Sequence, residues 1–278
     1  MPAIGANAGG SAPCGGAIRL TDCIPLDDPK YPPHDPVPWK RVERIGLATL
    51  YLGDCREIAP TLTRPAAIVT DIPYGISQES GGLRSLEYGE WDYDANLGQS
   101  VLAGFQDAPS ILAFCDYRQL SGLFDTFPVR SSRCVAWVKS NPTVMNGQHL
   151  LLPALEVAYY GKLPGAWFGG RCIRSVWEGP APTEREHPTQ KPVAVMRWSL
   201  LQAPDAQTVC DPFAGSGTTG VACVLEGRKF TGIEREPKYF DIACQRIYNA
   251  QRQSKLFDEN EDVQKVQPEQ ANFGFPEK

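Results

Sequence analysis

Residues 208–220 read Thr-Val-Cys-Asp-Pro-Phe-Ala-Gly-Ser-Gly-Thr-Thr-Gly. The first three residues are apolar or β-branched and predict a strand, and the last three open a segment, 218–226, with helical spacing. Between them, Gly215 begins a G-x-G-x-x-G pattern, which lets the backbone approach a bound nucleotide closely. A strand, a glycine turn and a helix in this order are typical of a nucleotide-binding α/β fold, although a purely structural glycine turn would look the same.

The rest of the chain alternates between strand and helix patterns on both sides of this stretch. We expect strands at 48–52, 66–70, 110–115, 134–138, 156–160, 208–210 and 230–233, and helices at 55–62, 117–124, 193–201, 218–226 and 238–251. Such alternation predicts an α/β fold with a mostly parallel sheet and helices on both faces.

Three regions differ in composition. Residues 1–40 are rich in Gly, Ala and Pro, which predicts a flexible N-terminal arm. Residues 41–250 carry the α/β pattern and are expected to form one domain. Residues 251–278 are polar and are expected to form a C-terminal tail.

Composition excludes several classes. The chain has 278 residues, 42% hydrophobic and 21% charged, with no apolar run long enough for a membrane span and no signal-peptide pattern. Its nine cysteines form no C-x-x-C pair and it has only three histidines, so no zinc or other metal site is expected. The odd number of cysteines fits reduced thiols in the cytoplasm.

The charge is unevenly distributed. The chain carries a net charge of −5, which weighs mildly against a nucleic-acid partner. Residues 113–200, however, carry ten basic and six acidic side chains, so this middle segment is positive. On charge alone, a nucleic-acid surface and an ordinary solvated surface remain equally open.

A second motif follows the apolar run 66–70 and reads Asp71-Ile72-Pro73-Tyr74. The exocyclic amine of a nucleobase is a poor nucleophile because its lone pair is delocalised, so catalysis needs acceptors for its hydrogens. Asp71 supplies one acceptor and the Ile72 carbonyl the other, and Pro73 holds Ile72 extended, which fixes where that carbonyl points. Tyr74 offers a flat face to an extruded base. A strand that ends in a proline turn with a capping aspartate is the alternative interpretation.

The glycine loop also fits an NAD-binding turn. Glu234 follows Gly215 by 19 residues, a spacing at which a carboxylate binds ribose hydroxyls. Asp211 weighs against NAD, because it places a carboxylate where a dinucleotide needs room for its pyrophosphate. A cationic ligand such as S-adenosylmethionine would be attracted instead, with Phe213 covering it and Glu234 binding the ribose.

Together these motifs resemble those of the DNA amino-methyltransferases, which form N6-methyladenine or N4-methylcytosine. The amine motif of that family is Asp-Pro-Pro-Tyr, with Asn or Ser also found first, and Ile72 departs from it. Because only the backbone carbonyl of that position is used, we expect activity to survive. The family's Phe-x-Gly-x-Gly is matched by 213–217, and His-Pro-Thr-Gln-Lys-Pro at 187–192 resembles the segment that closes over the methionine end of the cofactor.

The resemblance spans residues 47–250 and implies a Rossmann-like S-adenosylmethionine-dependent methyltransferase fold. It assigns the amine pocket to residues 71–74. Asp54 would accept from the cofactor adenine amine, and Lys191 would pair with the cofactor carboxylate. The full set of cofactor-binding residues that it implies is Asp54, Thr189, Lys191, Asp211, Phe213, Ala214, Gly215, Ser216, Gly217, Thr218 and Glu234.

The amine motif precedes the glycine loop, which is the order of the permuted group called beta and the reverse of that in protein glutamine and most RNA amino-methyltransferases. Asp71 favours adenine, since cytosine-N4 enzymes more often carry serine there. The resemblance therefore implies a cytoplasmic, nucleoid-associated enzyme that methylates N6 of an adenine flipped out of double-stranded DNA. The alternatives are a cytosine-N4 enzyme, a non-catalytic DNA-binding protein that keeps the fold and, more distantly, an NAD oxidoreductase.

Two short insertions, 77–94 and 163–186, are candidates for target recognition, with a surface loop as the alternative for each. The first follows the amine motif directly, and the second mixes cations with aromatic residues, as contacts to phosphates and bases require. The candidate DNA-binding residues are Arg84, Lys139, Arg171 and Arg174. Because the recognition region is small, we expect a homodimer, whose second subunit completes the DNA footprint.

Overall fold

The computed structural model describes residues 37–75, 94–128, 130–142, 152–166, 174–183, 190–203 and 205–258. All except Val37 belong to one unit that begins at Pro38, so the arm predicted at 1–40 lies almost wholly outside the described residues. The strands in these ranges form one nine-stranded sheet in the order β1-β2-β9-β8-β3-β4-β6-β5-β7. Their bounds are β1 Arg41–Ile45, β2 Ala48–Leu52, β3 Ala67–Asp71, β4 Ser110–Cys115, β5 Ser131–Lys139, β6 Leu155–Lys162, β7 Val176–Gly179, β8 Thr208–Asp211 and β9 Lys229–Glu234.

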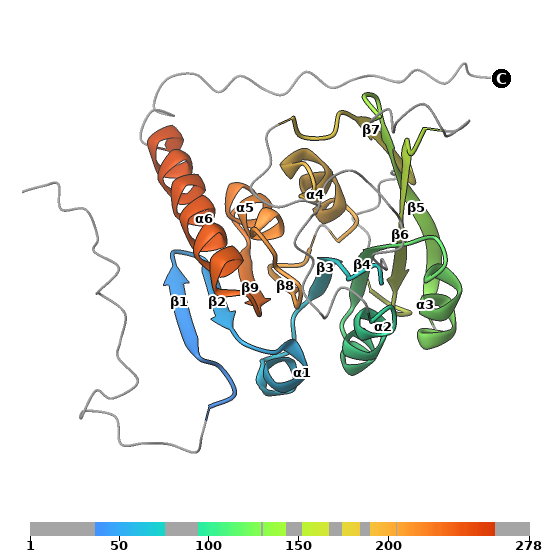
Figure 1. Ribbon diagram of the computed structural model, residues 1–278, viewed down its shortest axis with the longest axis horizontal. Coiled ribbons are helices and arrows are strands. Elements are labelled where there is room, and N and C mark those ends of the chain that lie inside the picture. The colour runs from blue at the N-terminus through green and yellow to red at the C-terminus, as the bar shows by residue number, and fades with distance from the viewer. Residues whose placement is uncertain are drawn as a thin grey trace, which may run out of the picture. The chain divides into compact units, whose positions relative to one another are not determined.

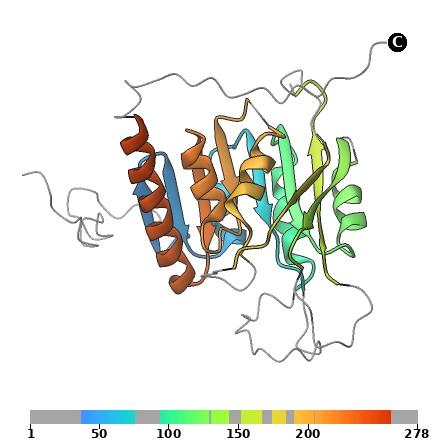
Figure 2. The same cartoon turned by 90° about the horizontal axis from the view of Figure 1, so that it is seen from above.

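The centre of the sheet is parallel. Strands β2, β9, β8, β3 and β4 all run in one direction, while β1 pairs antiparallel with β2, and β6 pairs antiparallel with β4 and β5. The mostly parallel sheet predicted from the sequence is confirmed. In Figure 2 the orange strands β8 and β9 stand between the blue and the cyan strands, so two strands from late in the chain separate β2 from β3.

Helices cover both faces of the sheet, as the sequence predicted. Figure 1 shows α4, α5 and α6 along one face and α1, α2 and α3 along the other. The helices are α1 Cys55–Ile58, α2 Leu97–Leu102, α3 Leu120–Thr126, α4 Val193–Leu200, α5 Thr218–Leu225 and α6 Pro237–Asp258, with 3₁₀ turns η1 Ala59–Thr61 and η3 Ala103–Phe105. None of the described helices is both long and apolar enough to span a membrane.

Alternating side chains of the central strands bury two separate cores. Val69 and Leu112 point into the cluster that contains the buried faces of α4, α5 and α6. Their neighbours Ile68 and Ile111 point into the cluster formed with α1, α2 and α3. A strand buried on both faces needs an almost continuous apolar run, which is why 67–70 and 110–115 lack the polar alternation of a surface strand.

The fold places the two sequence motifs side by side. β3 and β8 are parallel neighbours, paired through residues 67–68 and 209–210. From β3 the chain continues to β4 on one side, and from β8 it continues to β9 on the other. Such a reversal of strand order opens a crevice at the carboxyl ends of the strands. The amine motif, 71–74, and the glycine loop, 211–217, both lie at this point.

Most predicted elements are confirmed within a few residues, and the differences are local. Strands β1 and β7 and helix α2 were not predicted, because each is short and partly exposed. β7 falls inside the proposed insertion 163–186, where it pairs parallel with β5, so part of that segment belongs to the sheet. Helix α6 extends to Asp258, so residues 251–258 are helical and the prediction that the tail begins at 251 is wrong.

Candidate active site

A cavity of about 320 Å³ joins the two motifs. Its lining includes residues 71–74 from the end of β3 and residues 211–216 from the end of β8, together with Asp54, Lys191 and Glu234. The structure therefore brings together the residues that the sequence assigned to an amine pocket and to a cofactor loop. Thr189, Arg84 and Arg171 lie outside the described residues, and Arg174 is exposed just before β7.

Two glycines of the loop between β8 and α5 have left-handed backbone angles, with φ of 53° at Gly215 and 76° at Gly217. A methyl group added at Gly215 would meet no atom within 4 Å, so this position opens onto the cavity. At Gly217 it would lie 2.8 Å from the Cβ atom of Ala243 in α6. Gly215 therefore leaves room for a ligand, whereas Gly217 lets α6 pack against the loop.

Arg246 of α6 holds the loop between β8 and α5 in place. Nothing in the sequence around Arg246 predicted this contact. Its Nη1 atom donates to the Ser216 carbonyl at 2.6 Å, to the Ser216 hydroxyl at 2.8 Å and to the Thr218 hydroxyl at 3.1 Å. A guanidinium that satisfies three oxygens holds the turn in the shape that exposes its backbone to the cavity.

Asp211 lines the cavity but is already well bonded. Its Oδ1 atom accepts from the Thr70 hydroxyl at 2.6 Å and from the Phe213 backbone at 3.0 Å, and its Oδ2 atom accepts from the Thr219 hydroxyl at 2.6 Å. Burial raises the pKa of Asp211 to about 6, although the bonds from Thr219 and Thr70 oppose this rise. Asp211 thus ties β8 to β3 and α5 and remains largely ionised at neutral pH.

Glu234 closes the other side of the loop. Its Oε2 atom accepts from the Gly215 backbone at 2.8 Å, and its Oε1 atom accepts from the Glu236 backbone at 2.7 Å. Burial raises the pKa of Glu234 to about 7, because the stabilising backbone N–H groups offset only part of the lost hydration. The carboxylate has lone pairs left for a pair of hydroxyl donors at the cavity wall.

Asp54 follows β2 and lines the cavity. Its Oδ1 atom caps α1 by accepting from the Arg56 backbone at 2.9 Å, and its Oδ2 atom pairs with the Arg56 guanidinium at 2.5 Å. The hydrogen bond from the Arg56 side chain lowers the pKa of Asp54. Asp54 therefore stays an acceptor over the whole neutral range.

Ile72, where the motif of the DNA amino-methyltransferases has proline, has a structural explanation. The Ile72 backbone donates to the Phe114 carbonyl at 3.0 Å, which extends the pairing of β3 with β4 and which a proline could not do. The side chain is buried against α2, where a methyl group added at Gly98 would lie 2.5 Å from the Ile72 Cβ atom. Ile72 thus contributes side-chain packing in addition to its backbone carbonyl.

Gln119 supports the amine motif from the loop after β4, and sequence reasoning missed it. Its Nε2 atom donates to the Pro73 carbonyl at 2.9 Å and to the Ala95 carbonyl at 2.8 Å, while its Oε1 atom accepts from the Asp116 backbone at 2.9 Å. One side chain therefore links three segments around the entrance to the amine pocket.

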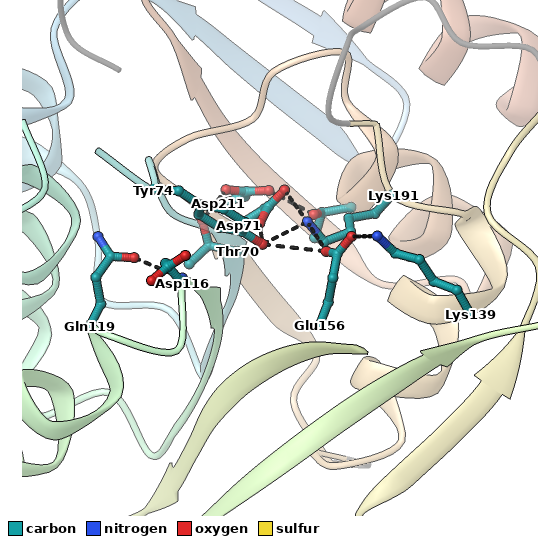
Figure 3. Close-up of polar contacts among 10 residues, drawn as sticks. Thr70, Asp71, Tyr74, Asp116, Gln119, Lys139, Glu156, Lys191 and Asp211 are labelled. Atoms are coloured by element: carbon teal, nitrogen blue, oxygen red, sulfur yellow. Dashed lines mark hydrogen bonds and ion pairs between the residues drawn. The ribbon is translucent and has the colours of Figure 1, made fainter. Parts of the chain in front are cut away.

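Asp71 ends a line of four alternating charges, which we call the charge chain: Lys139, Glu156, Lys191 and Asp71 (Figure 3). The Lys191 ammonium lies 2.6 Å from Asp71 Oδ2 and 2.9 Å from Glu156 Oε2, and Lys139 lies 2.5 Å from Glu156 Oε1. The Tyr74 hydroxyl donates to Asp71 Oδ1 at 2.9 Å and accepts from Lys191 at 3.0 Å. The four charges sum to zero.

The contacts of two residues differ from those expected from the sequence. Lys191 was predicted to pair with a cofactor carboxylate, but its buried ammonium instead neutralises Asp71 and Glu156. Lys139 was predicted to contact DNA, but its side chain is only 19% exposed and its ammonium is paired with Glu156. The sequence could not show either pairing, because the partners lie on segments that are far apart along the chain.

The charge chain shifts the pKa values of its members in different directions. Burial raises the pKa of Glu156, but Lys191 and Lys139 outweigh burial and lower it to about 2. Burial lowers the pKa of Lys191, but its two carboxylate partners raise it above its usual value. The pKa of Asp71 is raised by burial and by Glu156, which Lys191 only partly offsets. Asp71 is therefore the more basic of the two carboxylates.

The family model and the curated relatives that match this chain are DNA methylases and methyltransferases. A family model described as DNA methylase matches residues 167–245, which include Lys191, the glycine loop and Glu234. Type II methyltransferase M2.LlaDCHI of Lactococcus lactis subsp. cremoris is 40% identical over 84 residues. This match covers 28% of the chain and spans 31% of the length of that relative. The amine motif lies outside the segment matched by the family model.

Solved structures match over a longer stretch. The M1.HpyAVI–SAM complex is 26% identical, with a TM-score of 0.55, and the match covers 72% of this chain and 99% of that one. The cytosine-N4-specific PvuII DNA methyltransferase is 15% identical, with a TM-score of 0.57, over 79% of this chain and 94% of that one. The second likeness concerns the fold alone.

Proposed function

We propose that the chain is an N6/N4 DNA methylase and that it transfers a methyl group from S-adenosylmethionine to N6 of an adenine in double-stranded DNA. The observation that carries the proposal is the single cavity in which the Asp71–Tyr74 motif faces the glycine loop. A donor held by the loop and an amine held by the motif would meet there. The order of the two motifs along the chain supports the permuted group of the family.

The residues around the glycine loop fit S-adenosylmethionine. Gly215 leaves open space at the cavity wall. The ionised Asp211 gives that wall a negative charge suited to a cationic ligand, and Glu234 adds to this charge as it ionises above about pH 7. Glu234 also has capacity for two ribose hydroxyls. Asp54 lines the same cavity and is the proposed acceptor for the adenine amine of the cofactor. The cofactor, when bound, supplies an electrophilic methyl group.

The chain's own residues act on the amine. Asp71 accepts one N–H of the target nitrogen and the Ile72 carbonyl accepts the other, so the nitrogen becomes more tetrahedral and its lone pair points at the methyl group. Tyr74 stacks on the flipped base while its hydroxyl holds Asp71 Oδ1. Gln119 fixes the Pro73 carbonyl and so keeps the motif from yielding when the base enters. The surplus proton of the product leaves through the acceptor at Asp71.

DNA contacts are proposed for Arg84, Arg171 and Arg174, and a homodimer is proposed because the recognition segments are short. Arg174 is exposed beside β7, where a phosphate could reach it. A complex with DNA whose mass corresponds to one subunit at working concentration would overturn the dimer.

The function is tested by incubating the protein with genomic DNA and methyl-labelled S-adenosylmethionine and then digesting the DNA to nucleosides. We expect the label in N6-methyl-2′-deoxyadenosine, because Asp71 favours adenine. Label in N4-methyl-2′-deoxycytidine would replace adenine by cytosine as the target. DNA binding without any label would instead support a non-catalytic DNA-binding protein.

The affinity for S-adenosylmethionine is expected to weaken as the pH falls through about 7. Burial raises the pKa of Glu234 to about 7, so below that pH the side chain becomes a neutral acid and accepts hydroxyl donors poorly. Glu234→Gln should bind the cofactor more weakly at high pH and lose this dependence. Isothermal titration calorimetry between about pH 6.5 and 8.5 measures both effects. An unchanged pH dependence in Glu234→Gln would remove Glu234 from the cofactor site.

A further inference from the structure

The charge chain contains one carboxylate more than the proposed chemistry needs. Asp71 accepts from the target amine, but Glu156 on β6 holds the same ammonium, Lys191, at a similar distance. Glu156 also lies within 3.4 Å of the Tyr74 hydroxyl. Its side chain is 19% exposed, as is that of Lys139, while that of Lys191 is 4% exposed. Placing one buried and three half-buried charges side by side is costly unless each has a partner. The arrangement is therefore expected to serve a function.

We propose that Glu156 is a positioning residue of the amine site, which shares the Lys191 ammonium with Asp71 and so keeps Asp71 a strong acceptor. The inference rests on the proposed methyl transfer and deepens it. A carboxylate that alone neutralises a buried ammonium is a weaker acceptor for a base amine. When the ammonium is shared, Glu156 neutralises part of the charge of Lys191. Lys139 pairs with the other oxygen of Glu156 and so limits how strongly Glu156 attracts Lys191.

No other described group around Asp71 shares the Lys191 ammonium in the way proposed for Glu156. On its own loop the Tyr74 hydroxyl donates to Oδ1. From β8, the charge of Asp211 is tied to Thr70 and Thr219, and from β4 the Cys115 thiol is buried and its pKa is raised by burial to about 12, so it is neutral. Two charged groups therefore determine how strongly Asp71 accepts. They are Lys191, from the segment before α4, and Glu156, from β6.

Substitutions at Glu156 and at Lys139 are expected to shift the pKa of Asp71 in opposite directions. In Glu156→Gln, Asp71 loses a negative neighbour and holds Lys191 alone, so its proton is released at lower pH. In Lys139→Met, Glu156 loses one cation, draws Lys191 toward itself and leaves Asp71 more basic, so its proton is retained to higher pH. Because Asp71 accepts only when ionised, both changes appear in the acid limb of the pH–rate profile.

The experiment measures single-turnover methylation of DNA by the full chain against pH. Relative to wild type, we expect the acid limb to move down by about one pH unit in Glu156→Gln, with a rate on the plateau about tenfold lower, and to move up in Lys139→Met. Lys162→Met is the matched control, because Lys162 lies on the same strand as Glu156 but donates to the Ala166 carbonyl; its limb should not move.

Cofactor affinity and far-ultraviolet circular dichroism are recorded for each variant, so that a loss of folding is recognised. If Glu156→Gln does not fold, the acid limb of Lys139→Met still tests the positioning role of Glu156, because it is expected to move to higher pH. Acid limbs that coincide with wild type, or that move in the same direction in both variants, would overturn the positioning role while leaving the proposed function standing. A wild-type protein that methylates no DNA overturns the proposed function, and the positioning role with it.

Discussion

Replacing Asp71 by alanine is expected to abolish methyl transfer while leaving cofactor binding largely intact. The carboxylate is the proposed acceptor for the target amine, and the loss of a positioned acceptor of this kind costs about 10³-fold in rate. Most of the proposed cofactor-binding residues lie at the ends of β8 and β9, whereas Asp71 ends β3. Lys191 keeps Glu156 as a partner in the variant, so the local fold is expected to survive.

Single-turnover methylation with labelled cofactor measures the rate, and calorimetry measures the affinity for S-adenosylmethionine. Asp116→Ala is a matched control: Asp116 follows the neighbouring strand β4, its side chain pairs with Arg118, and it does not line the cavity. That variant should keep most of the activity. Full turnover by Asp71→Ala would refute the acceptor role.

Replacing Gly215 by leucine is expected to eliminate cofactor binding, with a loss of affinity of at least about 100-fold. The added side chain would enter the space that now opens onto the cavity, where a methyl group at this position would have no atom within 4 Å. Methylation should disappear with it, although the amine pocket is untouched.

Gly227→Leu is a control that distinguishes steric blockage of the cavity from strain of the backbone. Gly227 has φ of 66°, close to the 53° of Gly215, and it too has nothing within 4 Å of an added methyl group. It lies in the turn between α5 and β9 and does not line the cavity. Both variants should therefore lose similar stability in thermal unfolding, but only Gly215→Leu should lose the cofactor. Equal cofactor affinities in the two variants would contradict the placement of the cofactor beside Gly215.

The sequence predicted those parts of the site that depend on neighbours along the chain. The glycine loop is recognisable because strand, turn and helix follow one another within 208–220, and the amine motif is four consecutive residues. Their meeting in one cavity also followed, since carboxyl ends of parallel strands share one edge of a sheet.

What the sequence could not predict depends on strand order. The charge chain draws one side chain each from the ends of β3 and β5, from β6 and from the segment before α4. Its formation requires β6 to lie between β4 and β5, and antiparallel insertion of this kind has no local signature. Arg246 was missed for the same reason, because α6 reaches the loop only through tertiary packing.

The separation of β2 from β3 by β8 and β9 bears on the order of events during synthesis. The amine motif leaves the ribosome about 140 residues before the glycine loop. Until β8 and β9 have been made, β2 and β3 each present an unpaired edge, which invites pairing with other chains. A nascent chain in this state holds the proposed acceptor for the base amine but lacks the loop at which the methyl donor is proposed to bind. The proposed methyl transfer would therefore be confined to chains translated past β9, and a chaperone that shields these two edges is expected to raise the yield of active protein.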